Sequence, residues 1–225
     1  SSKPSQQSNT VRTGRTVGYP DTDGAISENT QLTRVGQRAD VVIGTRDFDT
    51  REIVIDLLRG QLAGSSEVVV SIPASVIANS GARDITVIGR DFTMKFNPGV
   101  FNNSAVNSNR SRADAGVRFR IAPVNESLNI PGGNNLSPAY ILEASIYIGK
   151  ENIKVDYLRS FINFSMDFDK AKADMRRLNN LKLHRYDDYK GVWTPVEHTI
   201  YEPGSSIITG VKDRLGRYVI IGSRR

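Results

Sequence analysis

Short segments rich in β-branched and aromatic residues, separated by Gly, Asn, Asp and Pro, recur from residue 39 almost to the end of the chain. Segments of this kind with turn residues between them are typical of β-strands. The pattern predicts an all-β fold, a β-sandwich of ten or more short antiparallel strands. The expected strands lie within residues 39–44, 51–58, 67–73, 84–96, 116–124, 140–149, 162–168, 181–186, 193–201, 205–211 and 217–222.

Two stretches depart from this pattern and predict one or two short helices. Residues 73–79 begin with Pro73, which suits the first turn of a helix, and continue with helix-compatible residues. Residues 169–177 form either a helical turn or two or a long polar loop. Neither stretch is long enough to make a helical layer.

The domain organisation follows from the change in composition near residue 35. Residues 1–34 are rich in Ser, Thr, Gln, Asn and Gly, so they bury too little apolar surface to offset the entropy of ordering them. We expect a polar linker or arm at 1–34 and a single β-sandwich domain at 35–225. A division of that domain into two subdomains near residues 125–138 stays open.

Composition excludes several kinds of chemistry. The chain has no cysteine, which rules out disulfides, zinc-thiolate sites and thiol nucleophiles. The longest apolar stretch, near residues 68–78, is much shorter than the roughly 20 residues of a membrane span. No phosphate-binding loop, dinucleotide-binding glycine motif or zinc-protease motif occurs. We therefore expect no cofactor, no metal site and no membrane span.

The net charge of +6 favours anionic partners, although the charges are scattered singly. Basic and aromatic residues do not interleave in a recognisable nucleic-acid-binding motif, so no nucleic-acid partner is expected. Arg110 and Arg112 lie in a long Asn/Ser/Arg-rich loop at 102–116. Their guanidinium groups can fork onto phosphate or carboxylate oxygens, or they can simply keep the loop soluble.

Residues 183–197, LHRYDDYKGVWTPVE, combine aromatic residues and charges around a polar corner at Asp187, Asp188, Lys190 and Gly191. This order first of all indicates a β-hairpin. Tyr186, Tyr189 and Tyr201 lie close in sequence around it and can form a platform on which a sugar stacks.

Candidate catalytic or metal-binding residues are few. The pairs Asp47/Asp49 and Asp167/Asp169 each place two carboxylates on one side of an extended segment, which suits either a calcium site, an acid/base pair or solvated loop acids. His184 and His198 are the only histidines and have no nearby G-x-S-x-G elbow, so a nucleophile triad is not expected.

The segment LKLHRYDDYKGVWTPVEHTIYEPGSSIITGVKDRLGRYVIIG resembles the closing segment of large secreted proteins of Gram-positive bacteria, including surface proteins anchored by S-layer-homology domains. The upstream segment VVVSIPASVIANSGARDITVIGRDFTMKFNPGVF is similar to the same family. The resemblance covers about residues 66–100 and 160–222. It implies a β-sandwich on the cell surface, outside the cell, in which Trp193 packs inward.

From this resemblance we expect a noncatalytic structural or interaction module of a bacterial cell-surface protein. Its partner would be a cell-envelope polysaccharide or another surface protein. A module that binds carbohydrate or cell-wall polymer is the first alternative. A glycan-active hydrolase is the second alternative. Such an enzyme would need paired carboxylates from different strands, which sequence alone cannot place.

Overall fold

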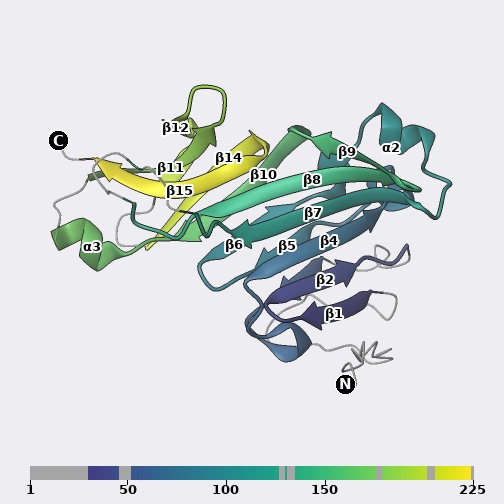
Figure 1. The fold of residues 1–225 in the computed structure, drawn as a ribbon, viewed down its shortest axis with the longest axis horizontal. Helices are drawn as coiled ribbons and strands as arrows, with labels where there is room; N and C mark the ends of the chain where they lie inside the picture. Colours follow the sequence, from purple (N-terminus) through teal and green to yellow (C-terminus); the bar gives the residue numbers. More distant parts are fainter. Residues whose placement is uncertain are drawn as a thin grey trace, which may run out of the picture.

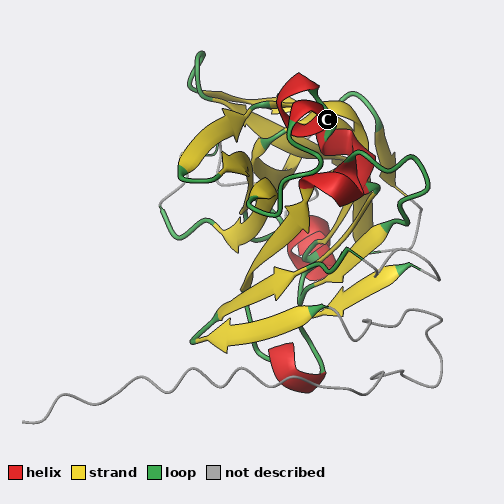
Figure 2. Ribbon diagram, turned by 90° about the vertical axis from the view of Figure 1, so that its right-hand side faces the viewer, coloured by secondary structure: helices red, strands yellow, loops and turns green. Residues whose placement is uncertain are grey.

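The fold consists of two β-sheets that pack against each other, shown in Figure 1 as a computed structural model of the chain. The structure describes residues 30–45, 52–126, 130, 135–175, 179–201 and 206–223. The predicted all-β class and the sandwich-like arrangement are confirmed, because strands make up most of the described chain and its helices are short. Figure 2 shows those helices as separate segments between strands.

The larger sheet, sheet A, has nine strands. Eight of them run in the order β1 (Gln31–Val35), β2 (Arg38–Val42), β4 (Glu67–Pro73), β7 (Ala115–Pro123), β8 (Tyr140–Ile148), β15 (Gly216–Ser223), β11 (Asn179–Asp187) and β12 (Val192–Pro195). The ninth strand, β9 (Glu151–Val155), also pairs with β8. The path from β1 to β12 crosses Figure 1 from its lower right to its upper left.

The smaller sheet, sheet B, has six strands. Their order is β13 (Thr199–Tyr201), β14 (Ile207–Arg214), β10 (Tyr157–Asp167), β6 (Phe92–Phe96), β5 (Ile85–Ile88) and β3 (Ile53–Asp56). The sequence of β6 shows why such segments become half-buried strands. Phe92, Met94 and Phe96 are buried while Thr93 and Lys95 between them are exposed, the alternation that a pleated strand produces.

The expectation that all strands pair antiparallel is wrong at two places. β2 pairs parallel with β4, and β3 pairs parallel with β5. The physical reason is the path of the chain, which alternates between the sheets from β2 through β3 and β4 to β5. Between two neighbouring strands of one sheet, the chain forms a strand of the other sheet. Such a crossover connection allows the two neighbours to run in the same direction.

Within the part of the chain that the structure describes, three α-helices and two 3-10 helices connect strands. The helix expected at 73–79 is confirmed as α1 (Ala74–Ile77), and the stretch at 169–177 contains α3 (Lys170–Met175). The 102–116 segment is not a continuous loop, because it contains α2 (Ser104–Ser108), where the Asn103 side chain accepts a hydrogen bond from the Val106 N–H at 3.0 Å. The 3-10 helices are η1 (Gly60–Leu62) and η2 (Pro98–Phe101).

The residues assigned to the polar arm are partly strand. β1 begins at Gln31 and pairs with β2, so residues 31–34 belong to the edge of sheet A. Residues 1–29 lie outside the described residues. One buried core cluster draws on strands both before and after residues 125–138, including Phe119 and Tyr218.

Aromatic side chains join the two sheets through the core. Phe96 of sheet B packs against Phe119 of sheet A with ring centroids 5.2 Å apart. Phe164 of sheet B contacts Tyr218 of sheet A at 5.9 Å. These contacts fix the position of one sheet on the other, because large rings bury much apolar area and prefer specific edge-to-face geometries.

Trp193 does not pack in this main core. It is only partly buried and lies against a small separate cluster that contains Val219, Ile130 and Ala139. Its ring also contacts Tyr186, with centroids 5.2 Å apart. The expected hairpin is confirmed, since β11 and β12 pair antiparallel from His184 to Val192.

Candidate functional site

A groove of about 630 Å³ opens where the edge of β8 changes partner. The first residues of β8 pair with β15, up to Leu142, and the later residues pair with β9 from Ala144 onward. The two partner strands share one edge of β8, so sheet A forks at this point. A groove of this size is within the range of small-molecule and sugar sites.

Two chain segments pass between the sheets beside this fork. The chain leaves β9 of sheet A at Asp156 and enters β10 of sheet B. It also leaves β14 of sheet B at Leu215 and enters β15 of sheet A. The Leu215 N–H donates to the Asp156 carbonyl at 3.3 Å, which joins the two crossings side by side.

The turn of the β11–β12 hairpin forms a further wall of the groove. The Asp187 carboxylate accepts hydrogen bonds from the N–H groups of Tyr189 and Lys190, each at 3.1 Å. These bonds, the one from Lys190 first, lower the pKa of Asp187. Gly191 follows with a φ of +67°, a conformation that favours glycine. The sequence therefore fixes the turn that presents Asp188 and Tyr189 to the groove.

Two exposed tyrosines lie along the groove. The Tyr157 side chain comes from the start of β10 and is 62% exposed, and Tyr189 from the hairpin turn is 97% exposed. Exposed rings of this kind offer flat apolar faces with a hydroxyl that hydrogen-bonds.

The carboxylates of the groove are already engaged. Asp156 pairs with Lys154 at 2.9 Å, and Asp188 pairs with Arg217 at 3.2 Å. Glu143 accepts a charge-assisted hydrogen bond at 2.7 Å from Arg120, which comes from the neighbouring strand β7. Together with the turn bonds of Asp187, these contacts leave no acid of the groove without a donor.

Arg217 is held from more than one side. Besides its bond to Asp188, its guanidinium lies over the Tyr186 ring at 5.0 Å and within 3.9 Å of the Glu126 carboxylate. Stacking and ion pairing both restrict a guanidinium. Arg217 therefore stiffens the hairpin wall.

Arg185 and Arg214 also line the groove, but their guanidinium groups contact a ring and a glycine backbone instead of a carboxylate. Arg214 lies over the Tyr157 ring at 4.7 Å, and Arg185 passes over Gly216, where an added Cβ would come within 3.7 Å of its Nη1. Gly216 has a φ of +138°, which other residues rarely adopt. Within the described part of the chain, no carboxylate lies at ion-pair distance from either guanidinium.

Tyr218 is a buried tyrosine that follows Arg217 on β15. Burial strongly raises the pKa of its phenol and the charge of Asp213 also raises it, while the charges of Arg185 and Arg214 act to lower it. The hydroxyl donates to the carbonyl of Arg214. This bond ties the buried phenol to the backbone of Arg214, at the end of β14.

Of the three tyrosines expected to form a sugar platform, one lines the groove. Tyr189 lines the groove, and Tyr186 supports it through Arg217 and Trp193. Tyr201 is in sheet B, where its ring packs on Phe168 at 5.9 Å. The groove instead uses Tyr157, which the sequence did not single out because it stands some 30 residues before the hairpin.

The Arg110 and Arg112 pair lies elsewhere. Both follow α2, at the far right of Figure 1, whereas the hairpin strand β12 is near its upper left. Arg112 makes two hydrogen bonds to the Asp114 carboxylate, at 2.9 and 2.8 Å, so its fork is occupied. Arg110 is exposed.

The carboxylate pairs do not form a shared site in the described chain. Asp47 and Asp49 lie outside the described residues. Asp169 accepts a hydrogen bond at 2.8 Å from a backbone N–H of α3 and thus begins that helix. Asp167 is instead affected by Asp91, since burial and this second charge raise the pKa of Asp167.

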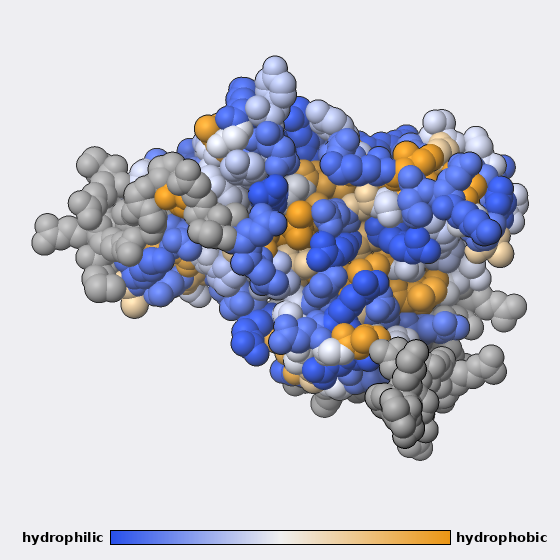
Figure 3. Space-filling view, in the orientation of Figure 1, coloured by the Kyte–Doolittle hydropathy of each residue, from blue (hydrophilic) through white to orange (hydrophobic). Residues whose placement is uncertain are grey.

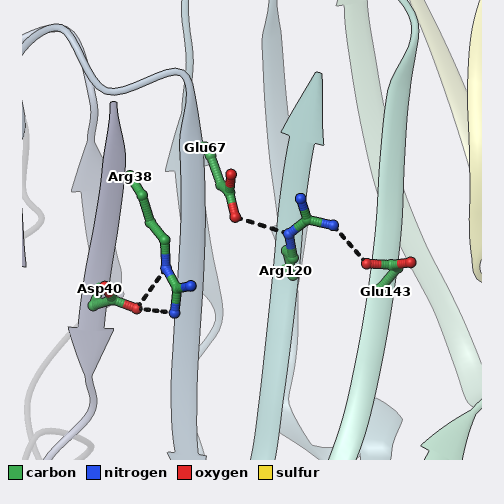
Figure 4. Close-up of polar contacts among 5 residues, drawn as sticks. All are labelled: Arg38, Asp40, Glu67, Arg120 and Glu143. Atoms are coloured by element: carbon green, nitrogen blue, oxygen red, sulfur yellow. Dashed lines mark hydrogen bonds and ion pairs between the residues drawn. The ribbon is translucent and has the colours of Figure 1, made fainter. Parts of the chain in front are cut away.

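A second arrangement of charges crosses the face of sheet A. Figure 4 shows Arg120 of β7 between Glu67 of β4 and Glu143 of β8, with N–O distances of 2.8 and 2.7 Å, beside the pair Arg38 and Asp40 on β2. The charges neutralise one another across neighbouring strands. Hydrophilic residues cover most of the face shown in Figure 3, and hydrophobic residues form small patches among them. We call these ion pairs the charge ladder; they belong to a solvated face of sheet A and do not form a binding site.

No family model matches the chain, and no curated protein matches it significantly. Among the described residues, no helix has the length and apolar character to cross a bilayer. The same residues contain no cluster of three or more His, Asp or Glu side chains suited to a metal ion.

Proposed function

We propose that the chain is a noncatalytic interaction module of a bacterial cell-surface protein, acting outside the cell, and that the groove binds an envelope polysaccharide. The surface location rests on the resemblance of residues 66–100 and 160–222 to secreted proteins. The choice of a polysaccharide as the ligand rests on the groove. A carbohydrate-binding module was the first alternative from the sequence.

The observation that carries the binding role is the combination of exposed rings and polar groups in one hollow. Tyr157 and Tyr189 are exposed, and guanidinium and carboxylate groups line the same groove. A sugar offers the complementary surface, because its ring has an apolar face and its hydroxyls both donate and accept hydrogen bonds. The groove is open to solvent along its tyrosines, which suits one segment of a chain-like ligand.

A purely structural role has support of its own. Two sheets with an extensive shared core and a neutralised charge ladder make a stable spacer. A structural module needs no groove whose arginines lack a carboxylate partner among the described residues, so binding explains more of the observed side chains. Another surface protein is the other partner that this groove would accept.

The test is retention on purified Gram-positive cell walls. We expect the double variant Tyr157→Ala/Tyr189→Ala to lose retention at least about tenfold, since loss of stacking on two rings is worth about 1 kcal/mol or more each. Tyr201→Ala is the matched control, because this tyrosine lies outside the groove and is 39% exposed. Equal retention of the double variant and the parent would contradict a glycan site at the groove.

A further inference from the structure

We propose that Arg185 and Arg214 form an anion-recognition pair, so that the ligand of the groove is an acidic glycan bearing a carboxylate or phosphate group. This inference rests on the proposed function, because it specifies the ligand of the same groove. It names a role for two residues that neither the hairpin pattern nor the Arg-rich loop singled out.

Most of the charged side chains that line the groove already have a partner of opposite charge or a backbone donor. Four cations line it, namely Lys154, Arg185, Arg214 and Arg217, and so do four acids. Each acid is bonded to another group of the chain, as described above. Lys154 and Arg217 have carboxylate partners, whereas Arg185 and Arg214 have none among the described residues, so these two guanidinium groups are the ones that can accommodate an added anion.

A neighbouring group holds each of these two guanidinium groups. Arg214 stacks on Tyr157, and Arg185 rests across the bare backbone of Gly216. Both side chains are therefore supported along one surface while their N–H groups have no carboxylate to bind in the described chain. A guanidinium presents planar, paired N–H donors that match carboxylate and phosphate oxygens.

The contact of Arg214 with Tyr157 connects the anion to a sugar. Arg214 covers part of the ring of Tyr157, so a sugar that packs on the exposed part of this tyrosine lies beside the guanidinium. Tyr189, on the hairpin turn, offers a second ring along the same groove. A free inorganic anion would use the arginines but not the tyrosines. A glycan with an acidic substituent uses both.

Calorimetric titration with defined oligomers tests the pair. The probes are an oligogalacturonate, a glycerol phosphate oligomer and a neutral galactan oligomer, all at about 0.15 M salt so that long-range attraction is screened. We compare the parent chain with Arg185→Gln/Arg214→Gln. The control, Arg110→Gln/Arg112→Gln, removes the same charge from the loop after α2.

We expect the groove variant to lose at least about tenfold in affinity for an acidic oligomer, since each lost hydrogen bond to a charged group is costly. The loop variant should change by less than about threefold, and the parent should bind the neutral oligomer at least about tenfold more weakly. The acidic oligomer whose affinity falls identifies the oxyanion as carboxylate or phosphate. Unchanged thermal unfolding of both variants checks that they fold.

Three results would overturn the inference. If the neutral oligomer binds as tightly and the groove variant is unaffected, the acidic ligand is wrong but the proposed glycan site stands. If both double variants lose affinity equally, net charge and not the pair attracts the ligand. If no oligomer binds the parent chain, the proposed function fails together with the inference.

Discussion

At the scale of single residues, the side chains near the hairpin divide into support and presentation. The Tyr186 and Trp193 rings pack against each other at a tilt, and Arg217 lies over Tyr186 while it pairs with Asp188. Because Arg217 is on β15, its contacts tie the hairpin to the neighbouring strand. Tyr189 alone of this group is almost wholly exposed. The aromatic residues of the segment are therefore mostly structural, and one is available to a ligand.

Trp193 provides a prediction about stability. Because it is only partly buried against a small cluster, we expect Trp193→Ala to cost about 1–2 kcal/mol, less than the roughly 3–5 kcal/mol for a ring truncated in a tight core. Phe119→Ala is the comparison, since Phe119 is fully buried between the sheets. Urea denaturation of the two variants measures both costs. Equal losses would show that Trp193 belongs to the main core after all.

At the scale of elements, local sequence predicts strands whose apolar residues are continuous or alternate. It misses β1 and β9, QLTRV and ENIKV, because both expose most of their side chains and so lack that signal. It also misses the parallel pairs, because whether a chain returns to the same sheet depends on distant packing. The short helix α2 is hidden in a polar segment and is fixed by its Asn103 cap.

The strand β11 carries a prediction about pH. Burial lowers the pKa of His184, which outweighs the hydrogen bond from its Nδ1 to the Lys182 carbonyl. The folded state therefore disfavours the charged His184 ring. In the unfolded chain the histidine has its ordinary pKa of about 6.5, so below that pH the unfolded chain binds more protons than the folded one. Stability is fully present above that pH and should fall as the pH drops below it.

The measurement is the urea midpoint between about pH 7.5 and 5.5. We expect His184→Gln to remove the part of the decline that belongs to this residue, by less than about 1 kcal/mol. His198→Gln is the control, because His198 is exposed and lies between β12 and β13. A decline that is unchanged in His184→Gln but lost in His198→Gln would contradict this assignment.

At the scale of the whole molecule, the groove is a product of topology. It forms where β8 changes partner from β15 to β9 and where two segments cross between the sheets. Its residues come from four parts of the chain, around residues 141–143, 154–157, 185–189 and 214–217. The hairpin part was visible in the sequence as a polar corner. The others were not, since nothing in their local composition shows that the fold brings them together.

Amide chemical shifts during titration with an oligosaccharide released from cell walls test whether this groove binds an envelope glycan. We expect the largest changes in the residues that line the groove, 141–143, 154–157, 185, 187–189 and 214–217, with smaller ones elsewhere. Changes centred on residues 109–113 after α2 or on the face of sheet A around Arg120, with the groove unaffected, would contradict glycan binding at the groove.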